Sequence, residues 1–275
     1  MSEGFHVALF NIWENDVVQE SQSSPQDVDR RTIGQDAQYL DAHFERRMDQ
    51  FKVILADTPE LLKIFLRMRH QVFCEEHPEY EESQRLNLLE QDEHDHHSLH
   101  FLVMYEPLHM IVGGTRVILP RTDLPWNGLP SVEAEGSYFQ EGFPYDLSRF
   151  CEISRFLLVR ERMKLVRAHQ GESRDQDNYP DVFRHMVRTV FSVCKEMSLT
   201  GFVGTLEESL FRRSKIFFGI SMTKFGEPFE YHGKRQGGYI ILNDALEEFR
   251  NFDLRVYHFI CDGEIPALRG GAHGE

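Results

Sequence analysis

The sequence predicts an α+β fold in which helices flank a mostly antiparallel, mixed central sheet. Short apolar runs with the composition of β-strands recur along the chain, and amphipathic stretches with helical spacing separate them without any internal repeat. The chain has 275 residues, of which 41% are hydrophobic and 22 are phenylalanine, which is enough for one sizeable core. We therefore expect an N-terminal extension at 1–49, one domain at 50–262 and a flexible tail at 263–275.

The first half of the domain should contain strands and one helix. Thr58 followed by Pro59 marks the start of this helix, because threonine caps a helix and proline fits its first turn. Arg69 interrupts the apolar stripe of the helix, whose members recur at spacings of three and four: Leu62, Phe65, Leu66, Val72 and Phe73. Strands are expected in this half at 51–56, 99–105 and 113–120.

The second half should add a central strand, a long amphipathic helix and closing strands. Residues 121–149 are rich in proline, glycine and acids, and we expect them to be a long surface insertion. The central strand follows at 151–159, and helices are expected at 182–197 and 209–218, the second ending at Gly219. Further strands are expected at 202–206, 222–225, 229–232 and 239–242.

The composition limits the classes of partner. The 30 basic and 45 acidic residues give a formal net charge of -15, which argues against nucleic acid or an anionic membrane as the main partner. The four cysteines show no CxxC spacing, as expected for free thiols in a reduced protein. The N-terminus has no basic region before an apolar run, and no apolar run approaches the ~18 residues of a membrane span. We expect a cytoplasmic protein without a secretory signal.

The central strand carries two charged residues inside an apolar run. Glu152 and Arg155 stand among isoleucine, phenylalanine and leucine, where an unpaired buried charge costs several kcal/mol. Strict alternation would place them on opposite faces of the sheet, so both serve one site only if a β-bulge near Ser154 re-aims one of them. The alternatives are a structural ion pair at a sheet edge and a reaction centre laid across a split strand.

Two further arginines, Arg69 and Arg116, also fall in or against apolar segments. Four acids are available to pair with the three arginines: Glu90, Asp92, Asp95 and Glu152. We expect these charges to meet, since each one alone would be heavily penalised in a core. Such a network can position groups, stabilise charge or take a proton, or it can simply tie the N-terminal half to the sheet.

Histidines lie close to these acids, at His94, His96, His97 and His100. Histidine beside aspartate can bind a metal. No distant cysteine or histidine motif completes such a site, so we interpret the cluster as a polar entry to the next strand and predict no metal.

Four motifs occur in order between residues 50 and 160. They are Arg69-His70-Gln71-Val72-Phe73, Glu90-Gln91-Asp92-Glu93-His94-Asp95, Gly114-Thr115-Arg116 and Glu152-Ile153-Ser154-Arg155-Phe156. In these motifs the chain resembles the autoinducer synthase family, the acyl-homoserine-lactone synthases, which are similar in fold to GNAT-type N-acyltransferases. The resemblance implies a GNAT-like fold with splayed central strands, here 151–159 and 202–206, that hold the acyl donor between them.

Other segments look more like a sister branch, the N-acyl amino acid synthases and the acyltransferases associated with PEP-CTERM/exosortase systems. These segments are Phe73-Cys74-Glu75-Glu76, Glu230-Tyr231-His232-Gly233-Lys234-Arg235 and the insertion before the Glu152 strand. Lactone synthases place a tryptophan a few residues after the phenylalanine that Phe73 matches, where it helps enclose S-adenosylmethionine. No tryptophan occurs from Cys74 to Tyr80, which argues against adenosylmethionine as the acceptor.

The segment after the central strand also departs from ordinary acetyltransferases. Those enzymes have a glycine-rich turn there, whose amides hold the pyrophosphate of coenzyme A. Here no glycine occurs before Gly171, and the segment is basic instead, with Arg160, Arg162, Lys164 and Arg167. An acidic acyl carrier protein could dock on these residues, and a solvated helix face is the alternative.

The resemblance implies an N-acyltransferase that moves a fatty acyl group from an acyl carrier protein thioester to a primary amine, giving an N-acyl amino acid-type signal for quorum sensing. Glu152 would accept the proton of the amine, with Ser154 and Arg155 as further catalytic candidates. The acceptor pocket would comprise Arg69, Phe73, Glu90, Asp92, Asp95 and Arg116. The donor side would comprise Phe156, Leu158, Arg160, Arg162, Lys164 and Arg167.

No tightly bound cofactor is implied, because the acyl-phosphopantetheine, on acyl carrier protein or coenzyme A, is a substrate. Two other functions compete with this one. One is an acyl-homoserine-lactone synthase that uses S-adenosylmethionine, and the other is a non-catalytic acyl-carrier or lipid-binding module.

Overall fold

The computed structural model describes residues 40–75, 88–134, 137–140, 142–171, 179–206, 208, 211–212, 214–215, 219–230 and 234–261. They form a seven-stranded sheet with the strand order β1-β2-β3-β4-β5-β7-β6. The strands are β1 (Phe51–Leu55), β2 (Ser98–Tyr105), β3 (Met110–Ile118), β4 (Phe150–Leu158), β5 (Gly201–Leu206), β6 (Thr223–Glu230) and β7 (Lys234–Ile241). Neighbouring strands are antiparallel except β4 and β5, which are parallel. The predicted mixed, mostly antiparallel sheet is confirmed.

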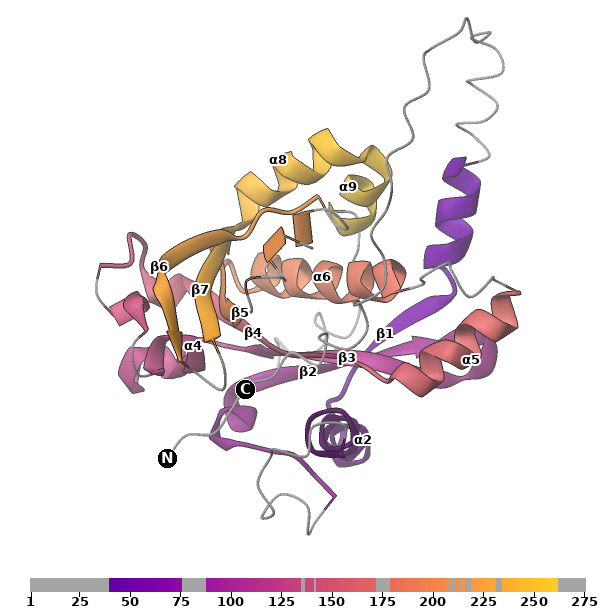
Figure 1. Cartoon of the computed structure of the whole chain (residues 1–275), viewed down its shortest axis with the longest axis horizontal. Coiled ribbons are helices and arrows are strands. Elements are labelled where there is room, and N and C mark those ends of the chain that lie inside the picture. The colour runs from indigo at the N-terminus through magenta and orange to yellow at the C-terminus, as the bar shows by residue number, and fades with distance from the viewer. Residues whose placement is uncertain are drawn as a thin grey trace, which may run out of the picture.

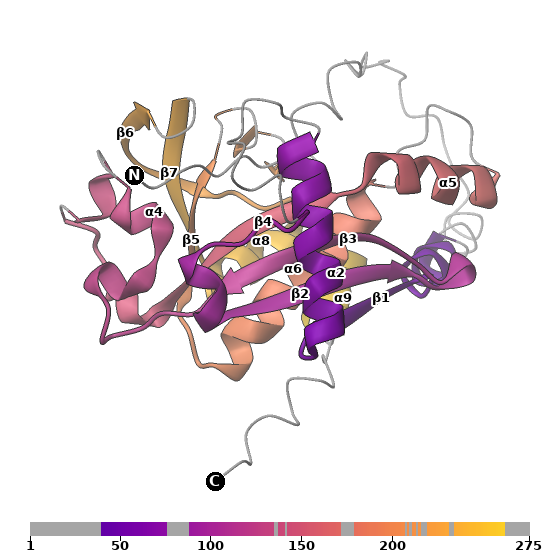
Figure 2. The same cartoon turned by 90° about the horizontal axis from the view of Figure 1, so that it is seen from below.

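Helices cover both faces of the sheet (Figure 1). On one side lies α2 (Pro59–His70), continued by η1 (Gln71–Glu75), and Figure 2 shows α2 crossing β2 and β3. The other side carries α6 (Tyr179–Glu196), α8 (Leu242–Phe252) and α9 (Leu254–Cys261), while α5 (Arg160–Gln170) follows β4 directly. None of the helices within the described ranges is long and apolar enough to cross a membrane.

Helix α2 begins where the sequence predicts and lies close against the sheet. The Thr58 side chain accepts a hydrogen bond from the Leu61 amide at 3.3 Å, and Pro59 occupies the first turn. Phe65 is fully buried against the sheet. A Cβ added to Gly114 of β3 would stand 2.5 Å from the Phe101 carbonyl oxygen and 2.9 Å from Cε2 of Phe65. Glycine at this position is therefore what allows the helix to pack so closely.

Strand β4 contains the predicted bulge. Opposite it on β3, Gly114 pairs with Leu157 and Arg116 with Ser154, so Arg155 and Phe156 together oppose Thr115. Arg155 has a left-handed backbone with φ of 50°, which costs a non-glycine residue about 1–2 kcal/mol. The extra residue turns Arg155 to the side of the sheet that Arg116 and Ser154 already face.

The central strands separate as the resemblance implies. β4 and β5 pair from Phe150 opposite Gly201 to Glu152 opposite Val203, and no pairing between them continues beyond that point. Both strands run on past it, to Leu158 and Leu206. We refer to the point where the pairing ends as the fork.

The segment 121–149, expected to be a surface insertion, lies only partly on the surface in its described residues: Trp126, Tyr138 and Tyr145 are exposed, whereas other side chains are buried. This segment forms η4 (Pro125–Gly128), α4 (Pro130–Glu133), η5 (Tyr138–Gln140) and η6 (Leu147–Arg149). Leu129, Val132 and Phe139 are at most 2% exposed and pack with Ile118, Phe150 and Val203 of the sheet. The apolar side chains scattered among the prolines and glycines thus share one core with the sheet at the fork.

The C-terminal elements also differ from the prediction. The strands expected at 222–225 and 229–232 are one strand, β6, interrupted by an irregularity between Phe225 and Phe229. After β7 come α8 and α9, where no helix was predicted. The N-terminal extension up to residue 39, the tail at 263–275, and parts of the helix expected at 209–218 lie outside the described residues.

Candidate active site

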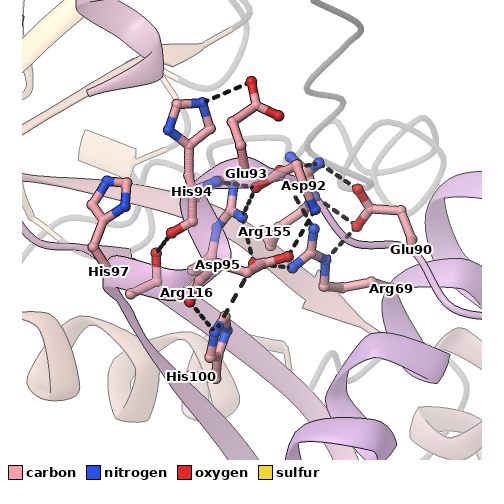
Figure 3. Close-up of polar contacts among 12 residues, drawn as sticks. Arg69, Glu90, Asp92, Glu93, His94, Asp95, His97, His100, Arg116 and Arg155 are labelled. Atoms are coloured by element: carbon pink, nitrogen blue, oxygen red, sulfur yellow. Dashed lines mark hydrogen bonds and ion pairs between the residues drawn. The ribbon is translucent and has the colours of Figure 1, made fainter. Parts of the chain in front are cut away.

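Three arginines and three acids meet where the last turn of α2 lies against β3 and β4 (Figure 3). The arginines come from α2, β3 and β4, and the acids from the chain that leads into β2; we refer to the six as the charge network. Its members are Arg69, Arg116, Arg155, Glu90, Asp92 and Asp95. The arginines are 0–5% exposed, and each one forms ion pairs with at least two of the acids. The predicted meeting of these charges is confirmed for these six residues.

Glu90 links two of the arginines. Arg155 binds it with two parallel hydrogen bonds, Nε to Oε2 at 2.9 Å and Nη2 to Oε1 at 2.5 Å, and Arg69 Nε donates to the same Oε2. Glu90 is only 2% exposed. Burial alone would raise the pKa of Glu90, but Arg155 and Arg69 outweigh it and lower the pKa well below its usual range.

Asp92 and Asp95 link Arg116 to the same network. Arg116 Nη1 lies 2.5 Å from Asp92 Oδ1 and 2.6 Å from Asp95 Oδ1. The acids also hold each other in place, because Asp95 Oδ2 accepts the Asp92 amide at 2.8 Å and Asp92 Oδ1 accepts the His94 amide at 3.0 Å. This capping box fixes both carboxylates to the backbone of η2 (Glu93–His97), so they are preorganised for the arginines.

Two aromatic rings and one hydroxyl complete the network. The Cζ atom of Arg155 lies 5.3 Å from the ring centre of Phe73, and that of Arg69 lies 5.9 Å from the ring centre of Phe65. Ser154 Oγ accepts a hydrogen bond from Arg116 Nη2 at 3.0 Å. Phe73 and Ser154, both predicted as site residues, therefore contact the network directly.

Glu152 stands apart from the charge network. Ser131 holds both of its oxygens, through the amide to Oε2 at 2.8 Å and through the hydroxyl to Oε1 at 2.7 Å. Glu152 is 3% exposed. Burial raises the pKa of its carboxyl to about 7, although Ser131 and Arg116 act in the opposite direction. The grouping of Glu152 with the other three acids is wrong, because its carboxylate bonds to a serine of the insertion.

Sequence reasoning missed Ser131. The residue lies in the first turn of α4 and is fully buried. Proline at position 130 signals the helix start, but nothing in the local sequence indicates the partner across the fold.

The histidines near the network bond to backbone carbonyls. His97 Nε2 lies 3.0 Å from the Gly128 oxygen, and His100 Nε2 lies 3.3 Å from the Asp95 oxygen. Burial lowers the pKa of His100 to about 4. The described part of the chain contains no group of three or more side chains placed to hold a metal ion.

The predicted donor residues are only partly available to a donor. Leu158 is 2% exposed in the core, and Phe156 stacks on Phe183 of α6 at 5.2 Å, so both side chains face α6. Arg162 donates to the Ile111 carbonyl at 2.6 Å, and Lys164 pairs with Glu161 of its own helix at 2.6 Å. The basic character of α5 is thus partly used within the fold.

Comparison with known proteins agrees with this architecture. Residues 68–164 match the family model of the acetyltransferase (GNAT) domain, while a comparison with curated proteins finds no match. Among solved structures, BjaI, a CoA-dependent acyl-homoserine lactone synthase, is 20% identical with a TM-score of 0.53, over 75% of this chain and 89% of BjaI.

Two further solved structures show the same fold. The AHL synthase LasI is 13% identical with a TM-score of 0.51, over 78% of this chain and 96% of LasI. FeeM, an N-acyl amino acid synthase from uncultured soil microbes, is 12% identical with a TM-score of 0.50, over 74% of this chain and 98% of FeeM. Residues 68–164 therefore resemble the acetyltransferase (GNAT) domain, and the fold of the chain is similar to that of the two acyl-homoserine lactone synthases and of the N-acyl amino acid synthase.

Proposed function

We propose that this protein transfers a fatty acyl group from a phosphopantetheine thioester to a primary amine, with Glu152 as the general base. The observation that supports this most is the place and state of Glu152. Its carboxyl is buried at the fork, where a thioester can lie between two strands, and its pKa of about 7 suits a base that works at neutral pH.

The reaction needs two proton transfers and one exchange of bonds. An ammonium group loses its first proton to the Glu152 carboxylate, directly or through water, and the amine nitrogen then attacks the thioester carbonyl. The new amide bond forms as the carbon–sulfur bond breaks, and the second proton of the nitrogen passes to the thiolate of the carrier. Beyond Glu152 the β5-side edge of β4 is not paired with β5, so its amides are available to the carbonyl oxygen.

The charge network would shape the acceptor pocket. Its guanidinium groups are the buried part, whereas Asp92 and Asp95 are the more exposed members, with side chains 14% and 15% exposed. With three cations and three anions, the network presents no net charge to the acceptor. We propose an amino acid or a related amine as acceptor and an acyl carrier protein as donor, in keeping with the resemblance to the N-acyl amino acid synthases and to the acyltransferases associated with PEP-CTERM/exosortase systems.

The test is product formation by the purified full chain. Acyl carrier protein and coenzyme A thioesters are each incubated with a mixture of amino acids or with S-adenosylmethionine, and the products are identified by mass spectrometry. We expect N-acyl amino acids, lost in Glu152→Gln and retained in the control Glu93→Gln, whose side chain is 74% exposed. An acyl-homoserine lactone from adenosylmethionine would replace the proposed acceptor, and a lack of any acylated amine would refute the function.

A further inference from the structure

Ser131 of α4 contacts both central strands of the sheet. Its amide and hydroxyl hold the two oxygens of Glu152, and its Oγ lies 3.4 Å from Oγ1 of Thr205 on β5. A hydroxyl has one proton, and Ser131 gives it to the nearer acceptor, the carboxylate. Ser137 in turn donates to the Ser131 carbonyl at 2.6 Å, which braces the turn that carries the serine.

This contact lies where the two central strands part. Glu152 opposite Val203 is the last parallel pair of β4 and β5, and Ser131 contacts Glu152 on β4 and Thr205, two residues beyond Val203, on β5. Ser131 is fully buried, so water does not compete with its hydrogen bonds.

The charged groups around Glu152 cannot replace these bonds. Arg116 on β3 favours the ionised carboxylate, whereas Glu133, two residues beyond Ser131 on α4, opposes it by like charge. The neighbouring residue on its own strand is the buried thiol of Cys151. Within the described ranges, Ser131 is the only residue that donates a hydrogen bond to the Glu152 carboxylate.

We propose that Ser131 is a positioning residue for the acyl transfer: it fixes the orientation of the Glu152 carboxylate at the fork and favours its ionised form. The inference rests on the proposed function. A hydrogen bond to the charged form of an acid stabilises that form, so loss of the hydroxyl would leave Glu152 protonated to higher pH. Without the Ser131 hydroxyl, the Glu152 carboxylate would also adopt more than one orientation.

The experiment measures the ionisation of Glu152 and the activity separately. The carboxyl carbon of Glu152 is titrated by carbon-13 NMR in the full chain, its signal assigned by its loss in Glu152→Gln. In Ser131→Ala we expect the midpoint to rise by about one pH unit, the value of one hydrogen bond to a charged group. The acid limb of kcat/KM should move with it, so activity falls about fivefold at pH 7 and recovers above pH 9.

A matched control and a second variant accompany the test. Ser148 also donates its hydroxyl to a carboxylate, Asp146 at 2.7 Å, but in an exposed setting, so Ser148→Ala should leave both readouts unchanged. Ser131→Cys replaces the hydroxyl by a thiol, which is a weaker donor of similar size, so the midpoint of Glu152 should rise by a smaller amount. This variant provides the test if Ser131→Ala does not fold.

The outcomes separate this inference from the proposed function. An unmoved Glu152 midpoint in the Ser131 variants, or an equal loss of activity at every pH, would overturn the role of Ser131 while acyl transfer still stands. If the Glu152 midpoint shifts in the Ser131 variants but the protein acylates no amine, the hydrogen bonding of Ser131 to Glu152 is supported and the proposed function is refuted.

Discussion

Replacing Arg155 by alanine should destabilise the protein far more than the loss of a surface charge. Arg155 is 5% exposed, binds Glu90 through two hydrogen bonds and lies 3.2 Å from Asp92. Without it, three anions face two cations, and Glu90 stays buried with Arg69 as its remaining partner in the network. Breaking a buried ion pair costs about 3–5 kcal/mol, and because Glu90 keeps one partner we expect about 3 kcal/mol.

The assay is urea unfolding followed by circular dichroism, with a thermal melt beside it. A loss of about 3 kcal/mol corresponds to roughly 6–12 °C in Tm for a chain of this size. Arg121→Ala is the matched control, because Arg121 binds Asp123 with two hydrogen bonds, at 2.7 and 2.5 Å, but is 42% exposed. We expect the control to leave the free energy of unfolding nearly unchanged, because solvent screens an exposed ion pair. Equal effects of the two substitutions would refute the view that the charge network is buried and mutually dependent.

Three further predictions concern the base, the sheet and the donor. Folding raises the pKa of Glu152 to about 7. The protonated carboxyl therefore contributes to stability below the unfolded pKa, and this contribution, of order 3 kcal/mol, is lost as the pH rises through 7. In Glu152→Gln the free energy of unfolding should accordingly vary less between about pH 4.5 and 8. Gly114→Ala should cost about 1–3 kcal/mol in urea unfolding, whereas Gly204→Ala, whose added Cβ meets nothing closer than 3.7 Å, should be tolerated; equal losses would contradict the packing argument. Reversing the charges of Lys164 and Arg167 should raise the KM for acyl carrier protein with little change in kcat, which is also the effect expected of added salt on the wild type. If steady-state kinetics of the wild type show no salt effect, the carrier does not dock on α5.

The sequence was most informative where burial and charge conflict. Arg69, Arg116 and Arg155 stand in apolar segments, and that conflict alone predicts that they meet acids. The bulge at Arg155 was predicted on the condition that Glu152 and Arg155 serve one site; it is present, and it brings residue 155 to the face of Ser154. Both predictions hold because an uncompensated buried charge has few solutions.

Three other features of the structure were not predicted from the sequence. Ser131 is small and uncharged, and its bond to Glu152 spans 21 residues, so no local rule signals it. The buried side chains of the segment 121–149, such as Leu129, Val132 and Phe139, follow no regular spacing, and they find their partners only in the folded sheet. The helix α8 is different, since Leu242, Ala245, Leu246 and Phe249 recur at helical spacing and the signal was present.

The charge network also bears on how the chain folds. Its members come from α2, β3, β4 and the segment before β2, so the last contact forms only when all four have docked. Each guanidinium must lose its water before its carboxylates are fully in place, and this desolvation raises the energy of partly assembled states. The barrier to folding should therefore include the dehydration of three cations, and replacing the whole network by apolar side chains should speed folding even if it abolishes catalysis.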